Sequence, residues 1–134
     1  MLTLDNLRKA FGSVVAVDGL SLAITRGEVF GLLGPNGAGK STTINMAVGL
    51  LAPDSGAVTL EGGHDPADPR SRRMIGVCPQ SLAIYDELTG AENLRFFGSL
   101  YGISGTTLQA RIAELLRLVG LSDRAHDRAK TYSG

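Results

Sequence analysis

The chain has 134 residues, 43% hydrophobic and 19% charged, which is typical of one compact domain. Thirteen basic and thirteen acidic residues give a net charge of zero, which argues against a non-specific nucleic-acid binder. A single cysteine excludes an internal disulfide framework. Glycine accounts for 18 of the 134 residues, which is nearly twice its ordinary share of about 7%.

The first half of the chain mixes strand and helix patterns. Residues 1–25 alternate apolar and polar positions between turn signals, which predicts a small antiparallel sheet. The continuous apolar run at 29–33 predicts a parallel central strand buried on both faces. A helix is predicted over 40–51, and its expected apolar face consists of Ile44, Ala47, Val48 and Leu51.

The next segments continue this pattern and then become helical. A short strand is predicted at 57–60, a polar helical segment at 65–73, and a second buried strand at 74–78 that makes Cys78 a core residue. Thr89 and Glu92 form a capping box, which predicts a helix to about residue 101. A second amphipathic helix is predicted to end at Gly120, with an apolar face of Leu108, Ile112, Leu115, Leu116 and Val119.

One glycine-rich segment carries chemistry. Gly34-Pro-Asn-Gly-Ala-Gly-Lys40-Ser41 matches the G-x-x-x-x-G-K-[ST] pattern without a mismatch. Glycine lets consecutive backbone N–H groups approach a phosphate chain, and the positive end of the following helix faces it. Lys40 is expected on the β- and γ-phosphates, and the Ser41 hydroxyl on Mg²⁺. The sequence therefore predicts a nucleotide-phosphate site.

Four ordered motifs resemble those of ABC-type ATPases, the nucleotide-binding subunits of ABC transporters. The segment 34–42 resembles the Walker A motif, and Cys78-Pro79-Gln80 resembles the Q-loop. The segment 88–94 resembles the helix that follows the Q-loop, and Tyr132-Ser133-Gly134 resembles the opening of the signature motif. The details of 88–94 and 128–134 look most like the bacterial drug or polysaccharide export type.

The resemblance implies a role for particular residues. Phe11 would stack on adenine, Gln80 would reach Mg²⁺ and the attacking water, and Ser133 and Gly134 would meet the γ-phosphate held by a second subunit. Lys40 and Gln80 are thus the implied catalytic residues, and Ser41 and Gln80 the metal contacts. The implied nucleotide-binding residues are Phe11, Gly34, Pro35, Asn36, Gly37, Ala38, Gly39, Lys40, Ser41 and Thr42.

The implied fold is an α/β P-loop NTPase core of the ABC type with an N-terminal antiparallel β-subdomain and a helical subdomain, incomplete at the C-terminus. Residues 1–26 and 57–61 would form the β-subdomain. Residues 27–51 and 74–80 would form the P-loop core, and 81–134 the helical subdomain. The chain is therefore expected to be an N-terminal part of the ATP-binding domain that stops inside the signature motif.

The acidic pair that the family uses for hydrolysis is not found in the sequence. Asp86-Glu87 follows an apolar run, but it lies too close to Gln80 for a separate parallel strand and is interpreted as an acidic loop before a helix. His64 and His126 are expected at the surface and do not supply the family's switch histidine. Arg70, Arg72 and Arg73 are interpreted as a solvated helix face.

The resemblance implies ATP binding, and in the complete protein ATP hydrolysis that drives transport of a substrate across the membrane. The cofactors would be ATP and Mg²⁺, and the partners a second ATP-binding subunit and transmembrane permease subunits, with no nucleic acid. The location would be cytoplasmic, peripheral at the inner face of the cell membrane. The missing acidic pair puts hydrolysis by the chain alone in doubt. A soluble ABC-type ATPase acting on ribosomes or DNA, and a non-catalytic nucleotide-binding fragment, remain alternatives.

Overall fold

The computed structural model describes residues 1–81 and 83–132. The chain divides into two compact units, Met1–Val77 and Cys78–Gly134. Each unit has its own cluster of buried apolar side chains, and each is described separately below.

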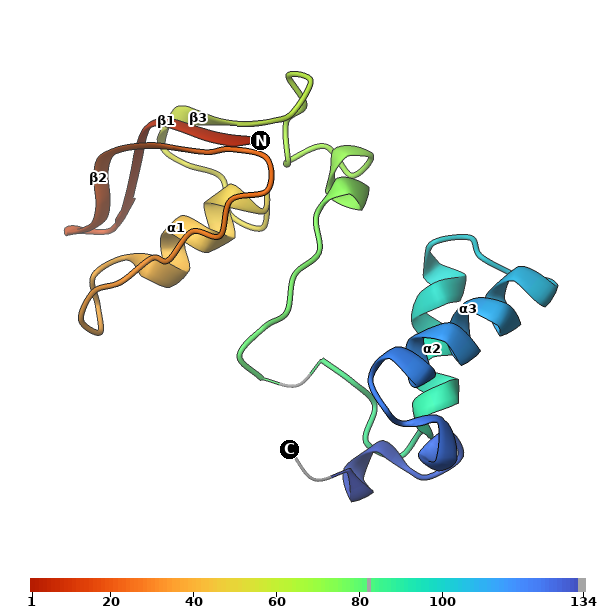
Figure 1. Ribbon diagram of the computed structural model, residues 1–134. Helices are drawn as coiled ribbons and strands as arrows, with labels where there is room; N and C mark the ends of the chain where they lie inside the picture. The colour runs from red at the N-terminus through yellow and green to blue at the C-terminus, as the bar shows by residue number, and fades with distance from the viewer. Residues whose placement is uncertain (82, 133–134) are drawn as a thin grey trace. The chain divides into compact units, whose positions relative to one another are not determined.

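The first unit contains an antiparallel sheet of three strands (Figure 1). Strand β1 (Leu2–Phe11) lies in the middle, between β2 (Val14–Ile24) and β3 (Ser55–Leu60). Strands β1 and β2 form a hairpin in which Phe11 pairs with Val14. The antiparallel sheet predicted for the start of the chain is confirmed.

An irregularity in β1 decides which of its side chains are buried. Leu4 and Leu7 are both buried although they are three positions apart, an offset that places side chains on opposite faces of a regular strand. The register shifts between them, and Asn6 adopts a positive φ of 47°. The shift acts as a β-bulge that returns Leu7 to the core face of the sheet.

Helix α1 (Lys40–Ala47) packs on this sheet (Figure 1). Met46, only 1% exposed, joins Leu4, Leu7 and Val17 in the core. The apolar face expected from the sequence is therefore partly wrong: Thr43 and Met46 are buried, whereas Ile44 is 48% exposed. The sequence pattern favoured the most apolar side chains, but the sheet covers a neighbouring part of the helix circumference, and of the expected face Ala47 and Leu51 pack against the core.

Helix α1 is also shorter than the expected 40–51. Gly49 has a φ of 73°, and the amides of Leu50 and Leu51 both donate to the Asn45 carbonyl. A Cβ atom on Gly49 would overlap the backbone of Pro66. The helix ends here because a left-handed glycine turns the chain where another backbone segment packs closely against it.

The two buried strands expected at 29–33 and 74–78 are not present, and this expectation is wrong for the chain as described. Val29 is 99% exposed, Leu33 is 93% exposed, and Cys78 is exposed rather than a core residue. A parallel strand needs hydrogen-bonded neighbours and covered faces. Among the described residues no strand pairs with 29–33 or 74–78, so neither segment has such a neighbour.

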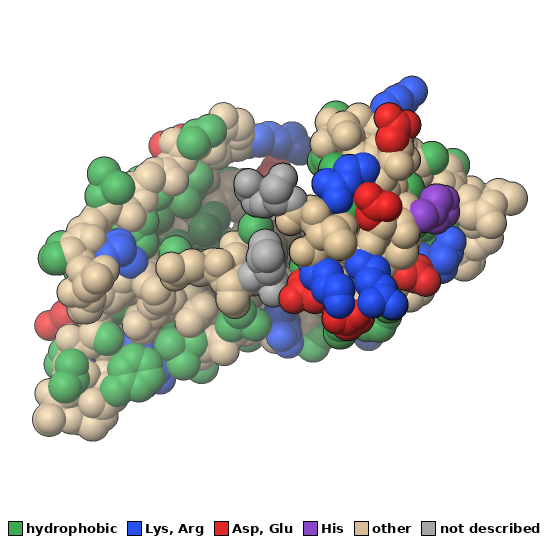
Figure 2. Space-filling model, turned by 90° about the horizontal axis from the view of Figure 1, so that it is seen from below, with side chains coloured by type: hydrophobic (Ala, Val, Ile, Leu, Met, Phe, Trp, Pro, Cys, Tyr) green, Lys and Arg blue, Asp and Glu red, His purple; other side chains and the backbone are tan. Residues whose placement is uncertain are grey.

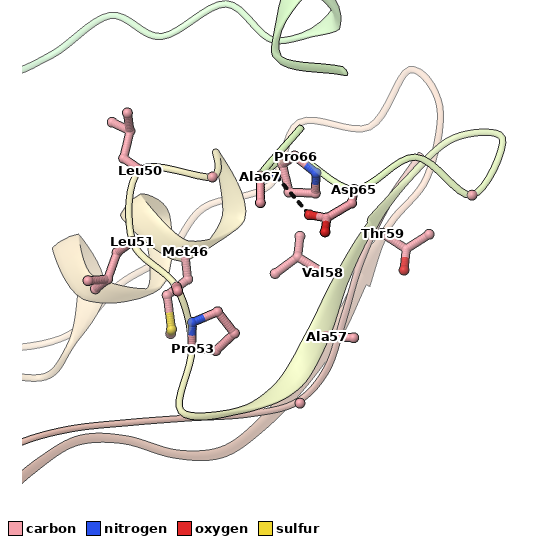
Figure 3. Close-up of a pocket in the computed structure, with 14 residues that line it drawn as sticks. Met46, Leu50, Leu51, Pro53, Ala57, Val58, Thr59, Asp65, Pro66 and Ala67 are labelled. Atoms are coloured by element: carbon pink, nitrogen blue, oxygen red, sulfur yellow. Dashed lines mark hydrogen bonds between the residues drawn. The ribbon is translucent and has the colours of Figure 1, made fainter. Parts of the chain in front are cut away.

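The polar segment predicted as helical at 65–73 forms turns and one short 3₁₀ helix, η1 (Ser71–Met74). The side chains of Arg70, Arg72 and Arg73 are exposed, as expected for a solvated surface. The residues before η1 line a hollow of about 510 Å³ between the end of α1 and β3 (Figure 3). Met46 from α1 and Val58 from β3 both line this hollow (Figure 3).

The second unit is a helical hairpin of α2 (Gly90–Leu100) and α3 (Gly105–Leu118). Two short 3₁₀ helices follow, η2 (Ser122–Arg124) and η3 (Ala129–Thr131). The core of the unit consists of Ala91, Leu108, Ile112 and Leu116. The expected face of the second helix is thus largely as observed, except that Val119 is 61% exposed.

The capping box predicted at the start of α2 is present. The amide of Glu92 donates to the hydroxyl of Thr89 at 3.2 Å, and the amide of Thr89 donates to a Glu92 carboxylate oxygen at 2.8 Å. These bonds satisfy amides that the first helical turn leaves without partners. The backbone and side-chain hydrogen bonds from Thr89 hold the pKa of Glu92 below its ordinary value.

This pKa shift predicts an acid-sensitive contribution to stability. Because the folded pKa is lowered, the contribution is present above the unfolded pKa of about 4.3 and is lost as pH falls through the folded pKa. A glutamine at position 92 can keep the hydrogen bonds of the box but carries no charge. We therefore expect wild type to be more stable than Glu92→Gln at pH 7, and we expect this difference in stability to vanish towards pH 3. Thermal melts followed by circular dichroism measure it, and parallel pH profiles would contradict it.

Candidate functional site

The glycine-rich loop at 34–39 leads directly into α1. Gly37 and Gly39 have φ angles of 84° and 80°, in the left-handed region that side chains disfavour. Gly39 is the N-cap of α1, and no side chain of the described residues caps this helix start. The first amides of α1 are therefore available to an anion, and the helix dipole favours negative charge at the same place.

Contact with β2 holds the loop in position. A Cβ atom on Gly39 would overlap the carbonyl oxygen of Ala16 and would lie 3.2 Å from the Val17 side chain. Only glycine allows this approach, so the start of α1 is seated directly against the strand. Sequence reasoning assigned Gly39 to the phosphate cradle alone and missed this second requirement, which no local pattern reveals.

The Lys40 side chain folds back over the loop. Its ammonium group donates to the carbonyl oxygen of Gly34 at 2.6 Å and to that of Pro35 at 2.7 Å. The residue is half-buried, and its aliphatic stem reaches close to Gly34. The ammonium is thus held above the glycines, where a bound phosphate oxygen would compete with the two carbonyls for its protons.

A cavity of about 460 Å³ lies beside the loop and the Lys40 side chain. The larger hollow shown in Figure 3 lies at the other end of α1 and is lined mainly by apolar groups. We assign the candidate site to the smaller cavity because it has the cation and the uncapped helix start. Its lining comprises Ala16, Val17, Asp18, Gly19, Leu20, Ser21, Leu32, Leu33, Ala38, Lys40 and Thr43.

The two hydroxyl residues that follow Lys40 differ in exposure. Ser41 is exposed and Thr42 is half-buried, both in the first turn of α1. A serine hydroxyl beside a phosphate-binding loop is a suitable oxygen ligand for Mg²⁺, which prefers hard oxygen donors. The residues present at this helix start therefore fit the expected cofactors chemically.

Phe11 lies at the end of β1 with 52% of its surface exposed. The Lys9 ammonium is 5.8 Å from the centre of its ring, and it also donates to Asp54 at 2.7 Å. The second Asp54 oxygen accepts from the Ala10 amide at 2.8 Å. These bonds fix the strand end that presents Phe11, and the Lys9 hydrogen bond is the main cause that lowers the pKa of Asp54.

The remaining expected site residues belong to the second unit or lie outside the described residues. Gln80 is exposed in the second unit, and Ser133 and Gly134 lie outside the described residues. The described part of segment 82–87 forms no strand, and Glu87 binds Arg128 at 3.2 Å and Lys130 at 2.8 Å. The acidic-loop interpretation of Asp86-Glu87 thus agrees with the structure.

Two further observations concern the expected surface histidines and metal sites. His64 and His126 are both exposed. In residues 1–81 and 83–132, no group of three His, Cys, Asp or Glu side chains is arranged to hold a metal ion. Within the same ranges, none of the helices has the length and hydropathy needed to cross a bilayer.

Comparison with known proteins places the chain in a family. The profile of the ABC transporter family matches residues 17–134, which include the loop, α1 and the whole second unit. This chain belongs to the ABC transporter family. It is 47% identical over its full length to the linearmycin resistance ATP-binding protein LnrL of Bacillus subtilis. It is 40% identical over its full length to the Nod factor export ATP-binding protein I of Ralstonia nicotianae.

Solved structures agree with this assignment. An ATP-binding subunit of an ABC transporter matches 98% of the chain with a TM-score of 0.82 and 33% identity. An ATP-binding cassette of an ABC transporter, MJ1267, matches 99% of it with a TM-score of 0.80 and 30% identity. The expected P-loop NTPase fold of the ABC type is confirmed. The chain spans 43% of LnrL and 55% of the first matched structure.

The contact between Gly39 and β2 predicts unequal effects of two glycine substitutions. Gly39→Ala and Gly37→Ala both place a side chain at positive φ, which costs about 1–2 kcal/mol. Only Gly39→Ala also pushes a Cβ into the Ala16 carbonyl, whereas nothing lies within 4 Å of the Cβ position at Gly37. We expect Gly39→Ala to lower the melting temperature clearly more than Gly37→Ala in calorimetry. Equal losses would contradict the seating of α1 on β2.

Proposed function

We propose that this chain binds ATP at the loop 34–42. The observation that carries the proposal is the combination of an uncapped start of α1, left-handed glycines before it, and the Lys40 ammonium held over the loop at 2.6 Å from the Gly34 oxygen. Backbone N–H groups, a helix dipole and one lysine are together what a triphosphate requires for binding.

The chemistry of the loop supports a role for each part. Asn36, Gly37, Ala38 and Gly39 would wrap the phosphates with their amides, and Lys40 would exchange its two carbonyl acceptors for phosphate oxygens. Thr42 would lie near the α-phosphate. The exchange keeps the ammonium hydrogen-bonded with and without nucleotide, so little reorganisation is needed on binding.

Ser41 and Gln80 would hold Mg²⁺, consistent with the oxygen ligands that this ion prefers. When bound, Mg²⁺ neutralises charge on the phosphates. The Ser41 hydroxyl is exposed in the first turn of α1, so it is free to turn towards an ion beside the phosphates. Gln80 is exposed and would bind the ion with its amide oxygen.

Phe11 would stack on the adenine ring. The exposed ring and the bonds that fix its strand end, from Lys9 and Ala10 to Asp54, support this role. Stacking needs the ring face and no polar group, so Phe serves as well as Tyr. The Lys9 ammonium lies over the Phe11 ring, 5.8 Å from its centre.

In the whole protein, we propose that ATP hydrolysis drives transport through permease subunits at the inner face of the membrane. Ser133 and Gly134 would act on the nucleotide of a second ATP-binding subunit. Family membership supports this role, and the relative named for Nod factor export supports an export system. The division into a β-subdomain, a P-loop core and a helical subdomain with the ranges given above is part of the same proposal.

The first test removes the lysine. Hydrogen bonds to a charged group contribute about 1.5–3 kcal/mol, so Lys40→Ala should weaken binding of ATP with Mg²⁺ about 10- to 100-fold in isothermal titration calorimetry. The matched control is Arg117→Ala, which removes an exposed cation from α3 and should leave the affinity unchanged. If Lys40→Ala binds ATP as tightly as wild type, the loop is not the ATP site.

The second test concerns the base. Aromatic contacts contribute about 0.5–1.5 kcal/mol beyond area burial, so Phe11→Ala should weaken ATP binding about 2- to 12-fold while Phe11→Tyr retains it. Phe30→Ala is the control, because Phe30 is a similarly exposed aromatic ring of the same unit, at 45%. Inorganic triphosphate should bind equally to wild type and Phe11→Ala. Loss of triphosphate binding as well would assign Phe11 a structural role instead.

A further inference from the structure

Two segments of the second unit are joined side by side. One is 86–91, which follows Gln80, and the other is 124–132, which precedes Ser133; together we call them the latch. Four backbone bonds connect them: Lys130 N to Asp86 O at 3.1 Å, Ala129 N to Leu88 O at 2.8 Å, Gly90 N to Asp127 O at 3.3 Å, and Ala91 N to Ala125 O at 3.0 Å. Thr89 and Arg128 form a β-bridge at its centre.

Charged side chains set the register of the latch. Glu87 accepts hydrogen bonds from Lys130 and Arg128, and the bond from Lys130 is the main cause that lowers the pKa of Glu87. Positive and negative side chains are interleaved on this unit in the view of Figure 2. Exposed ion pairs contribute little stability. They favour one alignment of the two segments, but the latch needs a packed contact to hold it.

Tyr132 provides that contact. Its hydroxyl donates to the carbonyl oxygen of Arg124 at 2.8 Å, and the Arg124 guanidinium lies 4.9 Å from the ring centre. The hydroxyl lies so close to Gly90 that a Cβ atom there would overlap it. Gly90 is buried in the first turn of α2. The absence of a side chain at Gly90 therefore makes the seat for the Tyr132 hydroxyl.

Asn93 ties the loop before α2 to the start of that helix. Its side chain, in a residue only 6% exposed, accepts from the Tyr85 amide at 2.8 Å and donates to the Tyr85 carbonyl at 3.0 Å and to the Thr89 carbonyl at 3.1 Å. The loop from Tyr85 to Thr89 is thereby tied to α2. An unbroken series of hydrogen bonds runs from this loop through α2 to Tyr132.

We propose that Tyr132 is a positioning residue. Its hydroxyl, seated over Gly90, fastens the residues before Ser133 to the segment that follows Gln80. Gln80 precedes the latch in the sequence and Ser133 follows it, and both belong to the nucleotide contacts proposed above, so the inference rests on the proposed function. Binding of ATP with Mg²⁺ at the loop 34–42 should then reduce the motion of residues 124–132 only when the Tyr132 hydroxyl is in its seat.

Hydrogen–deuterium exchange of the full chain tests the seat without nucleotide. Tyr132→Phe removes one hydrogen bond, so exchange in 124–132 should rise about 3- to 10-fold, the range for a bond of about 1 kcal/mol. Gly90→Ala displaces the hydroxyl and should have a similar effect. In the double variant the missing hydroxyl leaves room for the new methyl group, so the two effects should not add. Additive effects would overturn the proposed seat.

The same measurement with ATP and Mg²⁺ tests transmission along the latch. In wild type, exchange should slow both in 34–42 and in 124–132. In Tyr132→Phe, exchange should slow in 34–42 as in wild type but should not slow in 124–132. The control is Tyr101→Phe, at an exposed residue after α2, and it should behave as wild type. Protection of 124–132 that persists in Tyr132→Phe would overturn the inference.

The outcomes separate the two proposals. If ATP fails to slow exchange in 34–42, the proposed ATP site is wrong, and the non-additivity of Gly90→Ala and Tyr132→Phe still decides whether the seat exists. If ATP protects 34–42 but not 124–132 in wild type, ATP binding stands and the positioning role of Tyr132 is wrong.

Discussion

The close approach of Gly39 to the Ala16 carbonyl of β2 is the constraint on which the functional part of the first unit depends. It brings the start of α1 against the sheet with no side chain in between. The same packing carries Met46 into the core with Leu4 and Leu7, so the orientation of the helix is set at both ends. Because the helix axis is fixed, its uncapped amides face the loop in a defined direction.

This arrangement leaves a concentrated set of donors beside the cavity. The Lys40 ammonium rests on two loop carbonyls, and the helix start has no side-chain cap among the described residues. Such a site is prepared for an anion, since the donors are ordered before the ligand arrives and their ordering costs little on binding. The proposed ATP site thus combines backbone amides placed by the fold with the Lys40 ammonium held over the loop.

The second unit is organised around the hydrogen-bonded start of α2. The capping box of Thr89 and Glu92 starts α2, and Asn93 and Tyr132 attach the flanking segments to the same first turns. The segment that follows Gln80 and the segment that precedes Ser133 therefore both pack at the beginning of α2. Because both segments are bonded to the same helix start, a change in one of them can reach the other, as the proposed role of the latch requires.

Local patterns in the sequence were sufficient for features whose causes lie within a few residues. The phosphate-loop motif, the box formed by Thr89 and Glu92, and the stop at Gly120 depend on neighbouring side chains and backbone angles. The buried face of α3 followed from its spacing, because one neighbouring helix covers one stripe of side chains.

Only the tertiary structure decided the features that depend on distant backbone. The bulge at Asn6 decides that Leu4 and Leu7 share a face, and the sheet selects Thr43 and Met46 rather than Ile44 as the buried side of α1. The apolar segments at 29–33 and 74–78 have strand-like sequences, yet they stay unpaired because a strand is defined by its neighbours. Apolar pattern predicts a preference for burial, and packing partners determine whether burial occurs.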